Sequence, residues 1–297
     1  YVCVSFLLFF SYHESTYAQV CATPGFDGSA PVSGQLNTYY PAAANTTLTA
    51  GTTSTVLAAV PNDVSFAGGV NTYSKGQIHT GDLLLIIQMQ DATINSSNSN
   101  LYGASSTISG PDALGGSGYA SLGNSGLFEY VVATNDVPIT GGTLTFRGAG
   151  TNRGTVSTYY NIDFNTGDLI RGKRTFQVVR VPQYSNVRLI GSVLAPPFNG
   201  DAGGIIAFDV AGTMNFNGQT IDASERGFRA GFGFKASGAG TNGDNTTYAI
   251  NVSTNYFYSG KGEGIVGTPK NMWDGFLQVT NTLAGLPAGS DAKGAPG

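Results

Sequence analysis

Acidic and basic side chains gather in one stretch of this sequence at a spacing that could serve sugar chemistry. Asp209, Asp222 and Glu225 are followed by Arg226 and Arg229. Enzymes that hydrolyse glycosidic bonds place two carboxyl groups across a cleft, and polysaccharide lyases add a basic side chain. Asp209, Asp222 and Glu225 are therefore a candidate catalytic set. The alternative is that they are solvated side chains at corners between strands.

A second set of oxygen donors follows the apolar run at residues 83–87. Asp91, Asn95 and Asn98 supply carboxylate and amide oxygens, which are the ligands that calcium prefers. Their spacing does not match an EF-hand loop, and no glutamate closes the set. Calcium is the one cofactor that the sequence suggests, and the alternative is that the Asn side chains cap turns.

Other kinds of chemistry find little support. The sequence holds two Cys and two His, too few for a zinc site with about four closely spaced ligands. Cys21 follows a segment typical of a secretion signal, so we interpret it as an unpaired thiol or as the partner of a cysteine outside this sequence. Residues 262–267 match the G-x-G-x-x-G string, but no apolar strand precedes them, which favours a turn over a dinucleotide site.

Composition narrows the class of protein. The net charge is −4, and no basic stripe is present, which argues against a nucleic-acid binder. Charged residues make up only 11% and glycine numbers 43, a composition that disfavours helices. The hydrophobic fraction of 41% is too high for a disordered chain. These values predict a β-rich protein with a weakly charged surface, as extracellular proteins often have.

The elements that would position the acidic set lie in residues 173–231. Apolar side chains alternate there over 176–181, 187–194 and 205–210, and the pattern continues with Met214, Phe216 and Ile221. Such alternation predicts short strands with one apolar side, joined by Gly and Asn turns and stopped at Pro182, Pro196 and Pro197. The predicted fold is all-β, as a parallel β-helix-like stack or a β-sandwich with long Gly/Ser/Asn loops.

The remaining chain divides into three parts. Residues 1–18 resemble the remnant of a secretion signal, too short to span a bilayer. Residues 19–172 form an N-terminal β-rich region. It begins with a loop over 19–50, a strand within 52–60 and a strand over 81–90 buried on both faces. A long polar loop over 95–126 and a strand pair at 127–132 and 143–147 follow. Residues 232–297 are rich in Gly and aromatic residues, and we expect them to continue beyond this sequence.

Several phrases together resemble a known family. They are residues 81–91 (GDLLLIIQMQD), 94–98 (INSSN), 126–130 (GLFEY), 177–185 (QVVRVPQYS), 203–212 (GGIIAFDVAG), 222–229 (DASERGFR) and 260–269 (GKGEGIVGTP). The chain is similar over residues 19–297 to the N-terminal module of large secreted glycine-rich bacterial surface proteins, which carry downstream Ig-like repeats of unknown function. Relatives continue after Phe-Arg into several glycines, whereas Ala230, Phe232 and Phe234 interrupt that run here. The resemblance implies a place on the cell surface or in a matrix and transfers no catalytic residue.

Two hypotheses follow for function. The first is a non-enzymatic extracellular surface module for adhesion, matrix or fibre formation, with polysaccharide, other surface proteins or further copies of itself as partners. The second is a carbohydrate-active enzyme, a lyase or hydrolase that uses Asp209, Asp222 or Glu225, or a sugar-binding domain on the same scaffold. We expect no nucleic-acid partner, no membrane span and a secreted or surface location.

Overall fold

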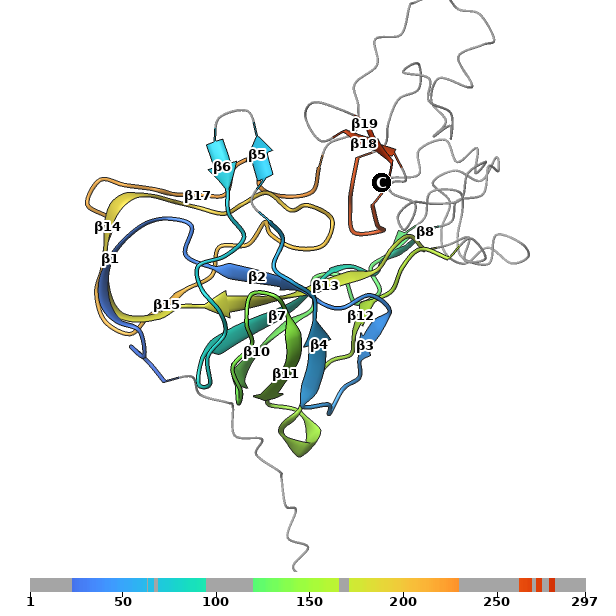
Figure 1. The fold of residues 1–297 in the computed structure, drawn as a ribbon, viewed down its shortest axis with the longest axis horizontal. Helices are drawn as coiled ribbons and strands as arrows, with labels where there is room; N and C mark the ends of the chain where they lie inside the picture. Colours follow the sequence, from blue (N-terminus) through green and yellow to red (C-terminus); the bar gives the residue numbers. More distant parts are fainter. Residues whose placement is uncertain are drawn as a thin grey trace, which may run out of the picture.

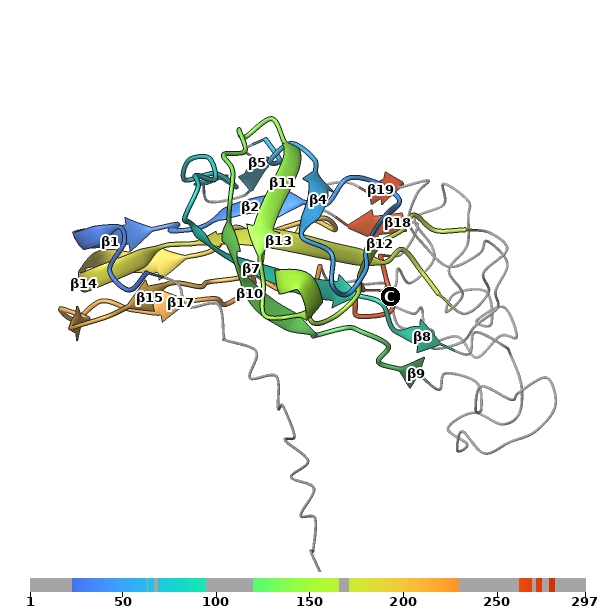
Figure 2. The ribbon, with the colours of Figure 1, turned by 90° about the horizontal axis from the view of Figure 1, so that it is seen from below.

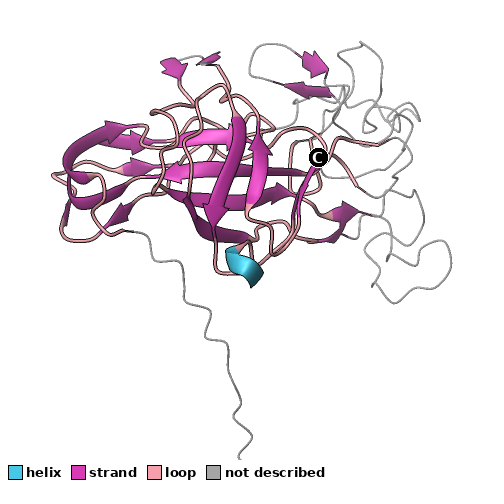
Figure 3. Cartoon of the chain, turned by 60° about the horizontal axis from the view of Figure 1, so that its bottom comes forward, coloured by secondary structure: helices cyan, strands magenta, loops and turns pink. Residues whose placement is uncertain are grey.

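The computed structural model describes residues 23–62, 64–66, 69–94, 120–165, 171–229, 262–268, 271–273 and 278–280. In this part of the chain the regular structure consists of strands and one short 3-10 turn, η1 (Thr151–Arg153) (Figure 3). The prediction of an all-β fold is confirmed. The architecture is a curled antiparallel sheet with a small parallel sheet beside it, and it is neither a β-helix solenoid nor a two-sheet sandwich.

The strands are short, and their order along the chain is not their order in space. They are β1 (Gly28–Gly34), β2 (Thr38–Pro41), β3 (Thr46–Leu48), β4 (Ser54–Leu57), β5 (Val64–Phe66), β6 (Gly69–Asn71), β7 (Leu83–Gln90), β8 (Thr93–Ile94), β9 (Ala120–Ser121), β10 (Phe128–Ala133), β11 (Gly142–Arg147), β12 (Tyr159–Asn161), β13 (Thr175–Val181), β14 (Gln183–Leu194), β15 (Asp209–Val210), β16 (Met214–Asn215), β17 (Ile221–Asp222), β18 (Asn271–Trp273) and β19 (Gln278–Thr280).

The larger sheet has six strands in the order β2-β13-β7-β10-β11-β4, and each neighbouring pair is antiparallel (Figure 1). The sheet curls until its two edge strands meet. Ala42, just after β2, forms a bridge with Leu57 of β4, and the Ala58 N–H donates to the Pro41 carbonyl at 2.9 Å. The result is a half-barrel with a closed contact at one end.

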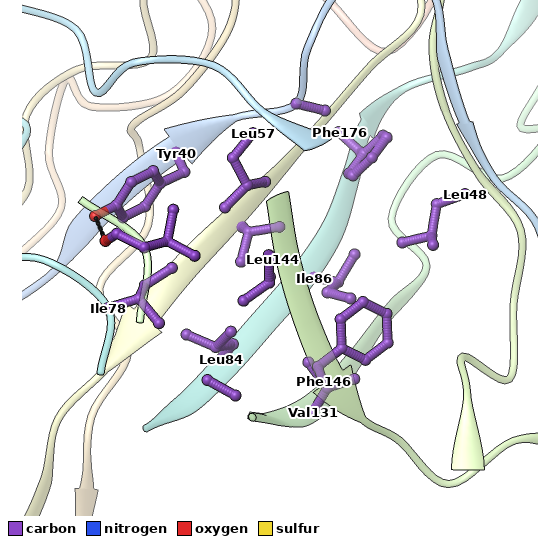
Figure 4. Close-up of a cluster of buried hydrophobic side chains, with 14 of the residues drawn as sticks. Tyr40, Leu48, Leu57, Ile78, Leu84, Ile86, Val131, Leu144, Phe146 and Phe176 are labelled. Carbon is purple, nitrogen blue, oxygen red and sulfur yellow. Dashed lines mark hydrogen bonds between the residues drawn. The ribbon is translucent and has the colours of Figure 1, made fainter. Parts of the chain in front are cut away.

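The concave side of this half-barrel holds the main core (Figure 4). Leu84 and Ile86 of β7 meet Leu144 and Phe146 of β11 there, all of them buried. A second buried cluster lies on the convex side and takes Leu83 and Leu85 from the same strand. The strand predicted over 81–90 is therefore confirmed as buried on both faces, because successive residues of β7 enter two different cores, although it begins at Leu83.

The smaller sheet begins where the larger one ends. Pro182 separates β13 from β14, so one nearly continuous stretch serves both sheets. β14 pairs in parallel with β1 on one side and with β15, β16 and β17 on the other. Figures 1 and 2 show these strands curving together at one side of the molecule. A third cluster, around Val187, Leu189 and Val193, fills the inside of the curve.

Several local predictions were right. The pair predicted at 127–132 and 143–147 is the antiparallel pair β10 and β11. The strand predicted within 52–60 is β4.

Other local predictions were wrong, mostly where tertiary pairing decides. The predicted loop over 19–50 contains β1, β2 and β3, because β1 gains its backbone partners from β14, far along the chain. The strand predicted over 205–210 is only Asp209–Val210, since Ile205 and Ala207 instead pack as irregular chain on the convex side of the half-barrel. The signal segment 1–18, Cys21 and most of 232–297 lie outside the described residues.

Candidate functional site

The parallel sheet repeats at a nearly constant spacing. Gln183 of β14 pairs with Asp209, Val187 with Met214 and Val193 with Ile221. Each residue of β14 therefore lies beside a residue 26, 27 or 28 positions later. We call β1, β14 and the row β15–β17 the parallel stack, and its three layers follow one another in that order. Because of this regular spacing, the exposure of a residue in one layer can be compared with that of its partner in the next layer.

The outermost layer of the stack leaves two of its large apolar side chains exposed, whereas Val210 and Met214 pack against the core of the stack. In the β14 layer, Leu189 and Val193 are 0% exposed. Continuing the register of β16 by one residue places Phe216 beside Leu189, and Ile221 is the direct partner of Val193. Phe216 is 49% exposed and Ile221 39%.

Phe228 is also exposed and packs edge-on against the buried Phe198, at 5.4 Å between ring centroids. We call Phe216, Ile221 and Phe228 the open end of the stack. Isolated exposed apolar residues are ordinary on a protein surface, whereas here two lie in one layer over buried neighbours of β14, and a third, Phe228, follows that layer in the chain.

The opposite end of the stack carries a cavity. It measures about 320 Å³ and lies along β1. Its lining combines apolar and charged residues, namely Ala30, Pro31, Val32, Leu36, Pro182 and Tyr184 with Asp27, Lys75 and Arg180, together with Ser33 and Gln35. A cavity of this size could hold one large side chain or one sugar ring.

Charged residues at the floor of this cavity are already neutralised by one another. The Arg180 guanidinium donates from Nε to Asp82 at 2.7 Å and from Nη2 to both Asp82 and Asp27 at 3.0 Å. Asp27 also accepts the Gln183 N–H at 2.7 Å. Asp82 is buried, so this pair is locked in place and ties β13 to the start of β1. The carboxylates are thereby held as structural acceptors.

Two other cavity residues are more available. Lys75 is exposed, and no carboxylate of the described residues forms an ion pair with its ammonium. Tyr184 is half-buried, and burial together with the nearby Asp27 carboxylate raises the pKa of its hydroxyl. It therefore remains a neutral phenol near neutral pH. The rim thus offers one positive charge and one neutral aromatic ring.

The predicted acidic set is spread along the open end of the stack. Asp209 and Asp222 pair with Gln183 and Leu194, which are the two ends of β14. Hydrogen bonds from the side chain and backbone of Ser224 lower the pKa of Asp222, which is exposed. Glu225 is exposed in a left-handed backbone conformation, with φ of 61°. Asp222 is therefore suited to remain a carboxylate and poorly suited to act as a general acid.

The predicted calcium ligands are described only in part, because Asn95 and Asn98 lie outside the described residues. Asp91 is buried, and its Oδ1 lies 3.6 Å from Arg171 Nη1 and 3.8 Å from Arg174 Nη1. Burial raises its pKa, against the opposing effects of the Asn124 N–H and the two guanidinium groups. Two cations beside this carboxylate disfavour a divalent ion. No group of three His, Cys, Asp or Glu arranged as metal ligands occurs among the described residues.

Residues 262–268 join the two sheets. Glu263 accepts from Nε and Nη2 of Arg229 at 3.0 and 2.9 Å, and Thr268 donates to it at 2.5 Å. The Ile265 carbonyl accepts the N–H groups of Asp91 and Ala92, each at 3.0 Å. The G-x-G-x-x-G string is therefore a turn that clamps the half-barrel to the stack. Gly264 and Gly267 exchange backbone hydrogen bonds across it.

A separate aromatic pair lies on β10. Phe128 and Tyr130 are exposed on the same side of the strand and meet edge to face, at 6.2 Å between ring centroids. Glu129, on the other side, accepts the N–H groups of Val156 and Ser157. Exposed aromatic rings of this kind can stack on sugars.

Sequence reasoning missed the cavity residues and Glu263. Arg180 carried a signal that could have found one of them, because a charged residue inside the apolar run over 178–181 requires a buried partner. Asp27 and Lys75 sit in polar, Gly-containing segments and carried no comparable signal.

Comparison with known proteins identifies no relative: no family model, no curated protein and no solved structure matches this chain. Within the described residues, no helix is long and apolar enough to cross a membrane.

Proposed function

We propose that this protein is a non-enzymatic extracellular surface module for adhesion, matrix or fibre formation. The observation that carries the proposal is the open end of the stack, where Phe216 and Ile221 are exposed beside the fully buried Leu189 and Val193. Uncovered apolar residues in one layer favour contact with another macromolecule. The parallel stack resembles a short piece of β-helix, an architecture that extends by adding layers.

The surroundings of the acidic set support a binding protein over an enzyme. Asp222 is exposed and has a lowered pKa, and the one carboxylate that lines the cavity, Asp27, is occupied by Arg180 and the Gln183 N–H. General acid catalysis of glycoside cleavage requires a carboxyl group whose pKa is raised. A secreted or surface location follows from the signal predicted in residues 1–18 and from the resemblance to secreted surface modules.

A sugar-binding role is the second candidate, favoured by the exposed pair Phe128 and Tyr130. The rings could stack on a polysaccharide while the rest of the sheet stays rigid. This role and assembly are compatible, because β10 belongs to the half-barrel and the open end belongs to the stack.

The test uses the purified full chain. Light scattering and negative-stain electron microscopy would follow assembly, and a glycan panel would follow binding and, in the same samples, the release of reducing or unsaturated sugar ends. We expect assembly or saturable glycan binding without turnover. Turnover that is lost in Asp222→Asn would establish the enzyme instead, and a monomer that binds no glycan would refute the proposal.

A further inference from the structure

The exposed apolar side chains at the open end of the stack could be buried by the residues that follow in the chain or by another molecule. A further layer at the same spacing of 27 residues would place Thr241 and Gly243 beside Met214 and Phe216. Neither residue offers an apolar side chain large enough to bury a phenyl ring. At this spacing the sequence that follows is thus a poor match for Phe216, and a different chain is the better candidate to cover its ring.

The other end of the same stack has complementary properties. The cavity along β1 has apolar walls in Ala30, Val32 and Leu36, and one aromatic wall in Tyr184. It lies along the side of the stack away from β15–β17, because β1 and the row β15–β17 are on opposite sides of β14. A protruding phenyl ring is a suitable occupant in both size and polarity.

Charge favours the same pairing. Asp222, in the layer that contains Phe216, and Glu225, which follows that layer in the chain, are exposed, and so is Lys75, which lines the cavity. Two open ends facing each other would bring these acidic residues together, whereas an open end facing a cavity would bring them toward a lysine. Unlike ends are therefore better matched than like ends.

The sequence of β1 indicates whether two copies would be joined by backbone hydrogen bonds or by an inserted side chain. Pro31 lies within this edge strand and has no N–H, so a continuous backbone ladder from copy to copy would lack a donor there. Insertion of a side chain does not need that donor.

We propose that copies of this chain associate head to tail, with Phe216 of one copy inserted into the β1 cavity of the next and with Lys75 facing the acidic residues. This inference rests on the proposed assembly function and names its partner as a second copy. A contact between unlike ends is heterologous, so it leads to a ring of copies where the rotation between neighbours closes and to an open chain where it does not.

The test is a mixing experiment with two variants of the full chain. Phe216→Ser removes the inserted ring and leaves the cavity intact. Ser33→Trp fills the cavity and leaves Phe216 intact. Sedimentation velocity of each variant alone should show at least about a tenfold weaker association than wild type, because burial of a large apolar side chain contributes at least one tenfold step. Ile139→Ser, a similarly exposed apolar residue in the β10–β11 connection, is the matched control and should assemble as wild type does.

Mixing the two variants should restore association but stop it at a dimer, because the mixture has one functional knob and one functional cavity per pair. Circular dichroism and thermal unfolding of each variant check that it is folded, and Lys75→Glu, at an exposed site, gives a second test of the cavity end. Association of Ser33→Trp and Lys75→Glu at wild-type strength would refute the head-to-tail contact while leaving assembly itself standing. A wild-type chain that stays monomeric at all concentrations would refute both.

Discussion

At the residue scale, the molecule is held by a few buried charged groups in otherwise apolar surroundings. Asp82 is the clearest case, because it is buried and receives two hydrogen bonds from Arg180. The apolar run around Arg180 made a buried partner predictable from the sequence, but not its identity. Asp82 precedes β7, and only the antiparallel pairing of β13 with β7 brings the two together.

Replacing Asp82 with Ala should lower the free energy of unfolding by about 3 kcal/mol, because it leaves a mostly buried guanidinium with only Asp27 as an ionic partner. Urea unfolding monitored by circular dichroism measures this. Glu225→Gln removes an exposed carboxylate and should leave the urea midpoint unchanged. Equal midpoints for the two variants would show that the Arg180 pair contributes little.

The free energy of unfolding should vary with pH because the pKa of Asp91 differs between the folded and the unfolded chain. Burial raises its pKa above the ordinary value of 3.8, so the folded chain binds this proton more readily than the unfolded chain does. The contribution of Asp91 to stability is then largest below pH 3.8 and is lost as the pH rises through the raised pKa. Comparison of wild type with Asp91→Asn across this range isolates the effect. A difference between the two that does not vary with pH would contradict it.

At the element scale, the strands with strong periodic patterns were predictable, and the short ones were not. β7 is a run of five apolar residues, and two cores bury it. β1 contains two Gly and a Pro, and it is a strand because β14 supplies its backbone partners. The regular β core predicted over residues 173–231, as a β-helix-like stack or a β-sandwich, is neither of these. β13 belongs to the antiparallel half-barrel, and only the pairs of β14 are parallel. The half-barrel depends on pairings between distant segments that no local pattern reveals.

Two turn glycines allow the cost of a strained backbone conformation to be measured separately from the cost of a steric clash. Gly141 and Gly126 have φ values of 83° and 85°. A Cβ at Gly141 would lie 2.5 Å from the Leu57 carbonyl oxygen, whereas a Cβ at Gly126 would have no atom within 4 Å. Gly126→Ala should therefore cost only the backbone strain of about 1–2 kcal/mol.

Gly141→Ala should cost at least about 2 kcal/mol more, because β4 must also move. Thermal unfolding of the pair measures the difference. Similar losses for both variants would show that the approach of the β10–β11 turn to β4 is not tight.

At the scale of the whole molecule, the chain crosses between the stack and the half-barrel at residues 35–37 and at Pro182, and the segment that contains Glu263 clamps the two sheets. The clamp is the part that the sequence obscured, since its glycines match a nucleotide-binding string while Glu263 acts as a buried acceptor. Its side chain is fully buried, and its partner Arg229 follows directly on the last layer of the stack. The same segment contacts β7 through Gln90, which donates to the Gly264 carbonyl at 3.0 Å.

This arrangement predicts that the Arg229–Glu263 pair couples the two sheets. Glu263→Ala should lower the free energy of unfolding by about 3 kcal/mol, because Arg229 loses its bidentate partner. Arg229→Ala should have a similar effect, and the double variant should lose far less than the sum of the two. A double-mutant cycle in urea therefore should give a coupling free energy of at least about 1.5 kcal/mol.

The exposed ion pair of His79 with Asp136 provides the comparison, since its cycle should show no coupling beyond experimental error. If the Arg229–Glu263 cycle also showed no coupling, the clamp would not join the two sheets, and the stack would be held by the two chain crossings and by the bonds of Arg180 to Asp82 and Asp27. Phe228 directly precedes Arg229 in the chain, and the Arg229 N–H also donates to Glu263. The clamp would therefore hold Phe228 in its exposed position against Phe198 as well.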